Sequence, residues 1–141
     1  MRPTHIVIHH SLTEDSTTVS WNAIRWYHIN TMGWKDIGYQ LGIELIGDHY
    51  EILMGRMLDE AGAHCKEGGM NSTSIGICMV GNFDQMPPNA AQMMLLVRLT
   101  RSLMYLFRIP RDNVKPHSYY APYKSCPGLK FPWSLFMEGL L

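Results

Sequence analysis

The sequence predicts an α/β fold in which a central mixed β-sheet is flanked by helices. Short β-branched runs alternate with longer segments of helical periodicity along the 141 residues, which is typical of a sheet covered by helices. A chain of about 150 residues can bury roughly 70% of the surface that it exposes when unfolded, which is enough for one core. We therefore expect residues 1–141 to form a single domain.

The predicted strands are short runs rich in β-branched residues. His5–His9 encloses three consecutive β-branched residues between two histidines, as in a strand that is covered on both faces. Ser74–Val80 mixes small and β-branched residues and is expected to be another central strand. Tyr39–Ile46 and Tyr50–Met54 are joined by Gly47-Asp48, two residue types that tolerate positive φ, so these runs are expected to form a hairpin.

The first helix is predicted between Ser16 and Gly33. Hydroxyl side chains that can cap a helix N-terminus are present at Ser16, Thr17 and Thr18, and Gly33 suits a helix C-terminus. Residues recur at helical spacing between these two ends, which indicates an amphipathic helix. Its inner face is expected to be formed by Val19, Ala23, Trp26, Tyr27 and Asn30.

The second helix is predicted to begin after Asn89, with Gln92 three residues later as in a capping box, and to end before Pro110. After it we expect a short strand at Asn113–His117 and a closing helix at Pro132–Leu140. The inner face of the second helix is expected to be formed by Met93, Leu96, Val97, Thr100, Leu103, Met104 and Phe107.

The composition is that of a folded enzyme without a strongly charged partner. Apolar residues make up 46% of the chain and charged residues 17%, which excludes a disordered segment. Twelve basic and twelve acidic residues cancel, so we expect no nucleic-acid binding. No apolar run approaches the roughly 18 to 20 residues that span a bilayer, and the first residues lack the apolar core of a signal peptide. We expect cytoplasmic synthesis without a signal peptide and no membrane insertion.

Two histidines and a cysteine are candidate metal ligands. His9 ends the first predicted strand, and His117 and Cys126 flank a loop that is long enough to bring both to one ion. Catalytic zinc usually takes three such ligands and leaves a fourth position for water. His10 must face away from His9, since neighbours in a strand point to opposite faces. The residues alone leave two alternatives open, a hydrogen-bonded histidine at His9 and an inert buried thiol at Cys126.

Short blocks of sequence occur in a fixed order over almost the entire chain. They are Ile8-His9-His10-Ser11, Ile24-Arg25, Tyr27-His28, Gly33-Trp34-Lys35-Asp36-Ile37-Gly38-Tyr39, Gly62-Ala63-His64, Asn71, Ser74-Ile75-Gly76-Ile77, Gly81-Asn82-Phe83, His117 and Lys124-Ser125-Cys126-Pro127-Gly128. This order resembles the type 2 N-acetylmuramoyl-L-alanine amidases, and within that family the short phage lysins and the peptidoglycan recognition proteins. One departure is a loop between His117 and Cys126 that is one residue longer than in the lysin pattern, at Tyr123.

The resemblance implies a zinc enzyme that hydrolyses the amide between N-acetylmuramic acid and L-alanine in peptidoglycan. It implies that the Zn²⁺ ligands are His9, His117 and Cys126. It also implies that Tyr39 orients the attacking water and that Lys124 faces the oxygen that gains negative charge. His64 belongs to a block that the family places near the cleft, which leaves two roles open: contact with the muropeptide, or only the capping of a loop. His64 and Asn71 are the candidate substrate-binding residues.

Other functions remain open at this level. A non-catalytic peptidoglycan-binding module is one alternative, although members that bind without cutting commonly lack the cysteine ligand, which is present here. A second is a cysteine hydrolase in which Cys126 attacks and His117 activates it. A third is a cytoplasmic amidase that recycles soluble muropeptides. The short length and the absent leader favour a phage endolysin, expected to be a monomer, that reaches the cell wall through a breached inner membrane.

Overall fold

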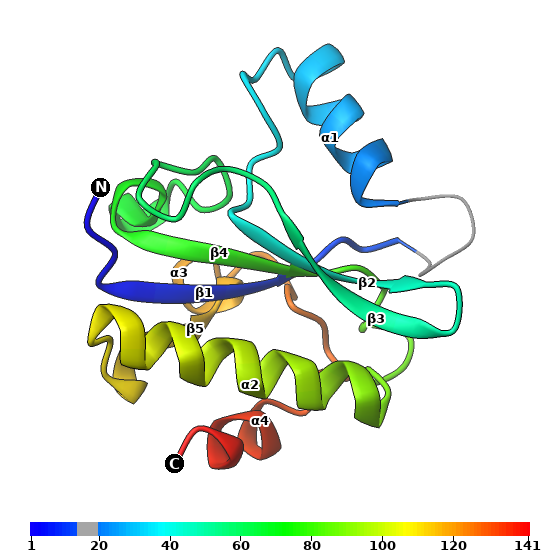
Figure 1. The fold of residues 1–141 in the computed structure, drawn as a ribbon, viewed down its shortest axis with the longest axis vertical. Helices are drawn as coiled ribbons and strands as arrows, with labels where there is room; N and C mark the ends of the chain where they lie inside the picture. The colour runs from blue at the N-terminus through cyan, green and yellow to red at the C-terminus, as the bar shows by residue number, and fades with distance from the viewer. Residues whose placement is uncertain (14–19) are drawn as a thin grey trace.

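The computed structural model describes residues 1–13 and 20–141, and the five strands within them form one sheet in the order β3-β2-β4-β1-β5 (Figure 1). Strand β1 is parallel to both of its neighbours, and β2 is parallel to β4 but antiparallel to β3. The predicted mixed sheet is therefore confirmed. The strands are β1 (His5–His10), β2 (Leu41–Ile46), β3 (His49–Met54), β4 (Ser74–Met79) and β5 (Val114–Pro116).

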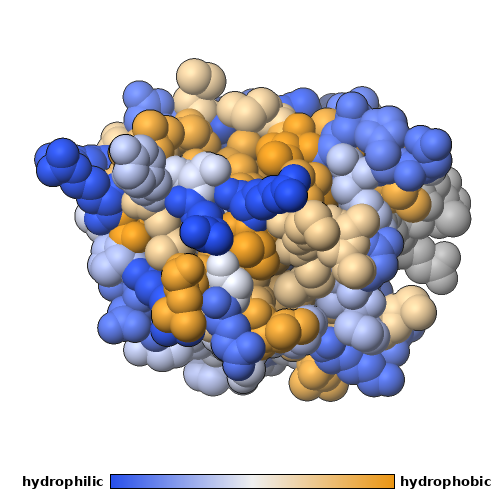
Figure 2. Space-filling model, turned by 60° about the horizontal axis from the view of Figure 1, so that its bottom comes forward, coloured by the Kyte–Doolittle hydropathy of each residue, from blue (hydrophilic) through white to orange (hydrophobic). Residues whose placement is uncertain are grey.

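Helices cover both faces of this sheet. The helices are α1 (Trp21–Asn30), α2 (Ala90–Phe107), α3 (His117–Tyr120) and α4 (Trp133–Gly139), with 3-10 turns η1 (Glu67–Ser72) and η2 (Arg111–Asn113). In Figure 1, α2 and α4 lie on one side of the sheet and α1 on the other. Figure 2 brings the α4 end forward and shows that hydrophilic side chains interrupt the apolar surface there. In the described part of the chain, no helix is both long and apolar enough to cross a membrane.

Helix α2 forms as its sequence predicts. The Asn89 side chain accepts a hydrogen bond of 2.8 Å from the Gln92 backbone N–H, which satisfies one of the free donors at the helix start. At the other end Arg108 adopts the left-handed conformation, with φ of 56°. Leu96 and Leu103 are buried against the sheet, and the remaining residues of the predicted inner face are buried or half-buried. That predicted face is confirmed.

The predicted inner face of α1 is wrong. The helix begins at Trp21, and the Ser20 hydroxyl accepts from the Ala23 N–H at 3.2 Å. Trp26 is 63% exposed and Tyr27 is 51% exposed, and Ala23 and Asn30 are also exposed. The expected caps at Ser16, Thr17 and Thr18, and the expected face residue Val19, lie outside the described residues.

Hydrogen bonding explains why α1 turns a different side inward. Trp21 is buried, and its indole N–H donates to the Met54 carbonyl at 2.9 Å. Arg25 lies on the same side of the helix, where it donates to Asp36 at 2.9 Å. His28 accepts from the Gly38 N–H at 2.9 Å. The inner side therefore mixes the polar Arg25 and His28 with apolar residues such as Ile24, which packs against the Trp21 cluster, and a pattern of apolar residues alone could not reveal it.

Boundaries elsewhere differ from prediction by one or two residues. The hairpin turn at Gly47-Asp48 is confirmed, and Gly47 has the positive φ of 67° that favours glycine. The segment after His117, expected to be a loop, begins with the short helix α3. The 3-10 turn η1 was not predicted, because its backbone depends on two consecutive left-handed residues, Gly68 and Gly69.

The alternation of β1 separates the core from the site. Ile6 and Ile8 pack in the main core with α2 and α4, whereas Val7 and His9 face the other side of the sheet. His10 points back toward the core side, where its Nδ1 accepts from the Phe83 N–H at 3.1 Å. The prediction that His9 and His10 face opposite ways is confirmed.

We expect Leu96→Ala to lower the free energy of unfolding by about 2 to 5 kcal/mol, because the fully buried Leu96 would leave a cavity between α2 and the sheet. Chemical denaturation measures this change. Tyr105→Ala, at a position on the same helix that is 89% exposed, is the matched control and should change stability by less than about 0.5 kcal/mol. Equal stability of the two variants would contradict the packing described for α2.

Candidate metal centre

The three ligands predicted from the sequence meet at one point of the structure. His9 lies near the carboxyl end of β1, and His117 follows directly after β5, the strand that pairs with β1. Cys126 returns to the same place from the loop beyond α3. The possible ligand atoms of all three residues lie within 4.8 Å of one another, and all three residues are buried.

The spacing of these atoms suits a tetrahedral ion. The Nδ1 atom of His9 lies 3.7 Å from the Sγ atom of Cys126. Bonds of about 2.0 Å to nitrogen and about 2.3 Å to sulfur, at a tetrahedral angle, separate two such ligand atoms by about 3.5 Å. The backbone N–H of His10 also donates to Sγ at 3.3 Å, which would favour the thiolate form. The donor set therefore fits zinc.

The second nitrogen of His9 has a protein partner. Its Nε2 lies 2.8 Å from the Nδ1 atom of His64, and the Nε2 atom of His64 lies 3.4 Å from the Ser74 hydroxyl. Both ring nitrogens of His64 therefore face protein atoms. Gly76 lies directly under this ring, because a Cβ atom at position 76 would come within 2.6 Å of it.

Burial sets the protonation state of the site. Removal from water lowers the pKa of His9, lowers that of His64 to about 3 and lowers that of His117 to about 4. The three imidazoles are thus neutral at pH 7, which is the form that binds metal ions. Burial also raises the pKa of Cys126 to about 12, so this thiol would need a nearby cation to ionise.

His9, His117 and Cys126 form one wall of a cavity of about 480 Å³. Tyr39 forms another wall, with its ring centroid 5.1 Å from that of His9. Burial raises the pKa of Tyr39, and its side chain hydrogen-bonds with that of Cys78. Lys124 is exposed at the rim, and its charge contributes to the lowered pKa of His9 and of His117. The structure thus brings both predicted catalytic residues to the ligand set.

Asn71 lies in an adjoining cavity that His64, His117 and Lys124 also line. Its Oδ1 atom accepts from the backbone N–H of His64 at 2.7 Å and from that of Cys65 at 2.8 Å. Asn71 therefore holds the loop that carries His64. Contact of Asn71 or His64 with a muropeptide stays a prediction.

A second group of potential ligands shares His117. Donor atoms of Cys65, Glu67 and His117 lie within 4.8 Å of one another, and the Tyr123 hydroxyl donates to the Glu67 carboxylate. The Nε2 atom of His117 lies 4.0 Å from Glu67, which is too long for a hydrogen bond. A neutral imidazole has a free lone pair on only one nitrogen. His117 can therefore serve only one of the two groups while its ring stays neutral.

Sequence reasoning missed several residues that shape the site. Ser74, Gly76 and Cys78 lie on β4, where they support His64 and Tyr39. Their small side chains at alternate positions of a predicted strand were a usable signal, because that pattern leaves room on one face of the sheet. Glu67 gave no such signal, since it meets Tyr123 only in three dimensions.

Comparison with known proteins agrees with this geometry. Residues 1–129 match the family described as N-acetylmuramoyl-L-alanine amidase. The endolysin of Klebsiella phage KP32 is 34% identical over 125 residues, which are 86% of this chain and 78% of that protein.

Solved structures with the same fold include both enzymes and recognition proteins. The N-acetylmuramoyl-L-alanine amidase LysC from Clostridium intestinale URNW is 30% identical with a TM-score of 0.84, over 99% of this chain and 85% of that one. Peptidoglycan recognition protein-LE, in complex with tracheal cytotoxin, is 26% identical with a TM-score of 0.77. The match covers 95% of this chain and 79% of that one. From the sequence match and the shared fold together, this chain belongs to the N-acetylmuramoyl-L-alanine amidase family, type 2.

Proposed function

We propose that this chain is a zinc-dependent N-acetylmuramoyl-L-alanine amidase of the endolysin type. The observation that carries the proposal is the meeting of two neutral imidazoles and one thiol, His9, His117 and Cys126, on one wall of an open cavity. The endolysin and amidase relatives support the same chemistry. Since all three ligands come from one chain, we propose that residues 1–141 act as one catalytic domain and as a monomer.

Zinc held by these ligands would act as a Lewis acid and would lower the pKa of a water molecule toward about 7. The residues around it then have separate tasks. Tyr39, in the cavity wall beside His9, would orient the attacking water. Lys124, at the rim, would place its positive charge near the carbonyl oxygen that becomes negative during attack.

The cavity also suits a muropeptide. Trp34, Tyr39 and Tyr123 line it, and aromatic rings can pack against the apolar face of a sugar. The related recognition protein-LE was solved with a monomeric diaminopimelic acid-type peptidoglycan. We propose that the substrate is peptidoglycan of the cell wall, with the scissile amide next to the ligand set.

The state of Cys126 separates this proposal from a cysteine hydrolase. A nucleophilic cysteine needs a thiolate, and enzymes of that kind lower the thiol pKa. Here burial raises it to about 12, so without a cation the thiol stays protonated and unreactive. The same thiol argues for hydrolysis rather than binding alone, because it completes the set of three ligands that catalytic zinc sites use.

We expect the purified protein to contain one zinc per chain and to release stem peptide from cell-wall preparations. His9→Ala and Cys126→Ser should lose both the metal and the activity, because two ligands hold zinc poorly. Elemental analysis and peptide release measure the two effects. His49→Ala, at an exposed histidine at the start of β3, is the control and should keep both. Cleavage that survives complete chelation would point to a cysteine enzyme.

Lys124→Ala is expected to lower turnover by about a hundredfold or more while zinc stays bound. Loss of one group that stabilises a developing oxyanion costs roughly 2.7 to 4 kcal/mol of activation free energy. Initial rates at saturating substrate, with zinc content measured in parallel, test this. Lys130→Ala changes an exposed lysine that does not line the cavity, and its rate should match the wild type. An unchanged rate for Lys124→Ala would remove that residue from the catalytic group.

Substrate form distinguishes an endolysin from a recycling amidase. We expect intact sacculi to be cleaved at least as fast as soluble anhydro-muropeptides, because the cavity is open to one side and bounded by exposed residues such as Tyr123 and Lys124. The measurement is release of free stem peptide from both substrates at equal amide concentration. Cleavage confined to the soluble fragments would favour the recycling role.

A further inference from the structure

A chain of hydrogen bonds leads away from His9 and ends at a group that can only accept. The Ser74 hydroxyl donates to the Met70 carbonyl oxygen at 2.7 Å. A carbonyl oxygen has no proton to give, and a serine hydroxyl has only one. The direction of the last bond is therefore fixed, and Ser74 can only accept from its remaining neighbour.

That neighbour is His64, and the fixed direction determines where its proton lies. The Nε2 atom of His64 is 3.4 Å from the Ser74 oxygen, so Nε2 must carry the hydrogen. The ring is buried, and a neutral imidazole carries a single ring hydrogen, which is here on Nε2. Its Nδ1 atom is then left with a free lone pair.

The same reasoning determines which nitrogen of His9 carries its proton. Its Nε2 lies 2.8 Å from the bare Nδ1 of His64, so Nε2 of His9 must be the donor. In the neutral form that binds a metal ion, the His9 ring then has its single hydrogen on Nε2 and none on Nδ1. That Nδ1 atom is the one that lies 3.7 Å from Cys126 Sγ. The lone pair of His9 is thus directed at the candidate metal position before any ion binds.

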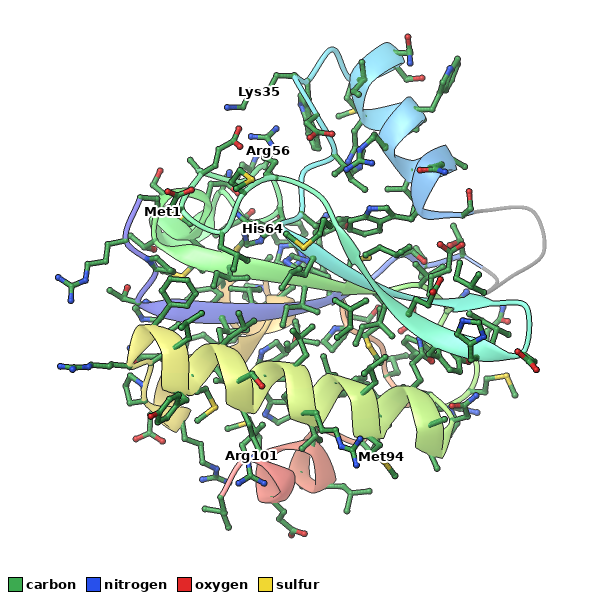
Figure 3. The ribbon with its side chains drawn as sticks, in the orientation of Figure 1. Met1, Lys35, Arg56, His64, Met94 and Arg101 are labelled. Atoms are coloured by element: carbon green, nitrogen blue, oxygen red, sulfur yellow. The ribbon has the colours of Figure 1, made fainter. Side chains whose placement is uncertain are left out.

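Packing holds the His64 ring in this orientation. Gly76 lies against one side of it, where any Cβ atom would clash at 2.6 Å. Asn71 holds the backbone N–H of His64 at 2.7 Å. The rings of His9 and His64 meet edge to face at an interplanar angle of 89°. In Figure 3, His64 lies on the side of the sheet opposite the labelled α2 residues Met94 and Arg101.

We propose that His64 is a positioning residue that fixes the tautomer of His9, through the chain from His9 by way of His64 and Ser74 to the Met70 carbonyl. A partner that hydrogen-bonds to the second nitrogen of a histidine ligand orients its ring and raises its basicity. The proposal rests on the proposed function, because it assumes that His9 is a zinc ligand. It differs from a contact between His64 and the muropeptide, because it acts on the ligand and not on the substrate.

Two variants with side chains of nearly the same shape test the role of the His64 Nδ1 atom as the hydrogen-bond acceptor for His9. In His64→Asn the amide oxygen can take the place of Nδ1 and accept from His9, whereas His64→Leu has a similar outline and no acceptor. Zinc affinity is measured by competition with a chromophoric chelator. We expect His64→Leu to bind zinc about 10- to 100-fold more weakly than the wild type, which is the usual effect of losing such a partner. His64→Asn should stay within a few-fold of the wild type.

A measurement on the metal-free protein tests the effect of His64 on the tautomer of His9 without zinc. Long-range ¹H–¹⁵N correlation spectra distinguish histidine rings protonated at Nε2 from those protonated at Nδ1. His9 should be protonated at Nε2 in the wild type and should lose this single preference in His64→Leu. Ser74→Ala removes only the hydroxyl acceptor, because the backbone carbonyl of residue 74 also accepts from the His64 ring, so its zinc affinity and its His9 tautomer should change less than those of His64→Leu.

The outcomes separate the possible failures. Protonation of His9 at Nδ1 in the wild type, or equal zinc affinity of His64→Leu and His64→Asn, would overturn the proposal. If His64→Leu does not fold, as judged by circular dichroism, the tautomer of His9 in the wild type still decides. A wild type that binds no zinc would refute the proposed function. The tautomer measurement would still test whether His64 fixes the proton position on His9. A raised KM of His64→Leu with unchanged zinc affinity would overturn the proposal and indicate that His64 contacts the substrate instead.

Discussion

The site depends on the parallel pairing of β1 with β5. In that register Ile8 pairs with Pro116, so the residues that follow each position, His9 and His117, emerge at the same edge of the sheet. Two residues more than a hundred positions apart in sequence are thereby held side by side, with ring centroids 4.5 Å apart. Cys126 then needs only the short return of the loop after α3 to join them. Sheet pairing thus places the two candidate nitrogen ligands, and one loop supplies the candidate sulfur ligand.

Burial gives this edge its chemistry. The hydrophobic core lies on the α2 side of the sheet, but the opposite face is packed closely enough to exclude water from His9 and His64. Low polarity disfavours every charged form, so the imidazoles are neutral and the thiols are protonated. Such a site would suit a cation, because the cation would offset the cost of forming the thiolate while the imidazoles supply lone pairs.

Local signals in the sequence predicted the parts that form locally. Helix α2 has a cap, a continuous apolar face and a left-handed end within one segment, and the central strands are short β-branched runs. Helix α1 differs because its inward side bears Arg25 and His28, whose partners lie on distant segments. Apolar periodicity is blind to such polar contacts, so it assigned Trp26 and Tyr27 to the wrong side.

By itself the sequence determined the fold class, the helix and strand pattern, and the candidate ligands His9, His117 and Cys126, because residue type and order carry that information. Only the tertiary structure decided which nitrogen of His9 faces the sulfur, that His64 stands behind it, and that Tyr123 meets Glu67. The physical reason is distance along the chain. The His9 contacts with His64 and Cys126 join residues 55 and 117 positions apart, and hydrogen-bond direction exists only once folding has brought them together.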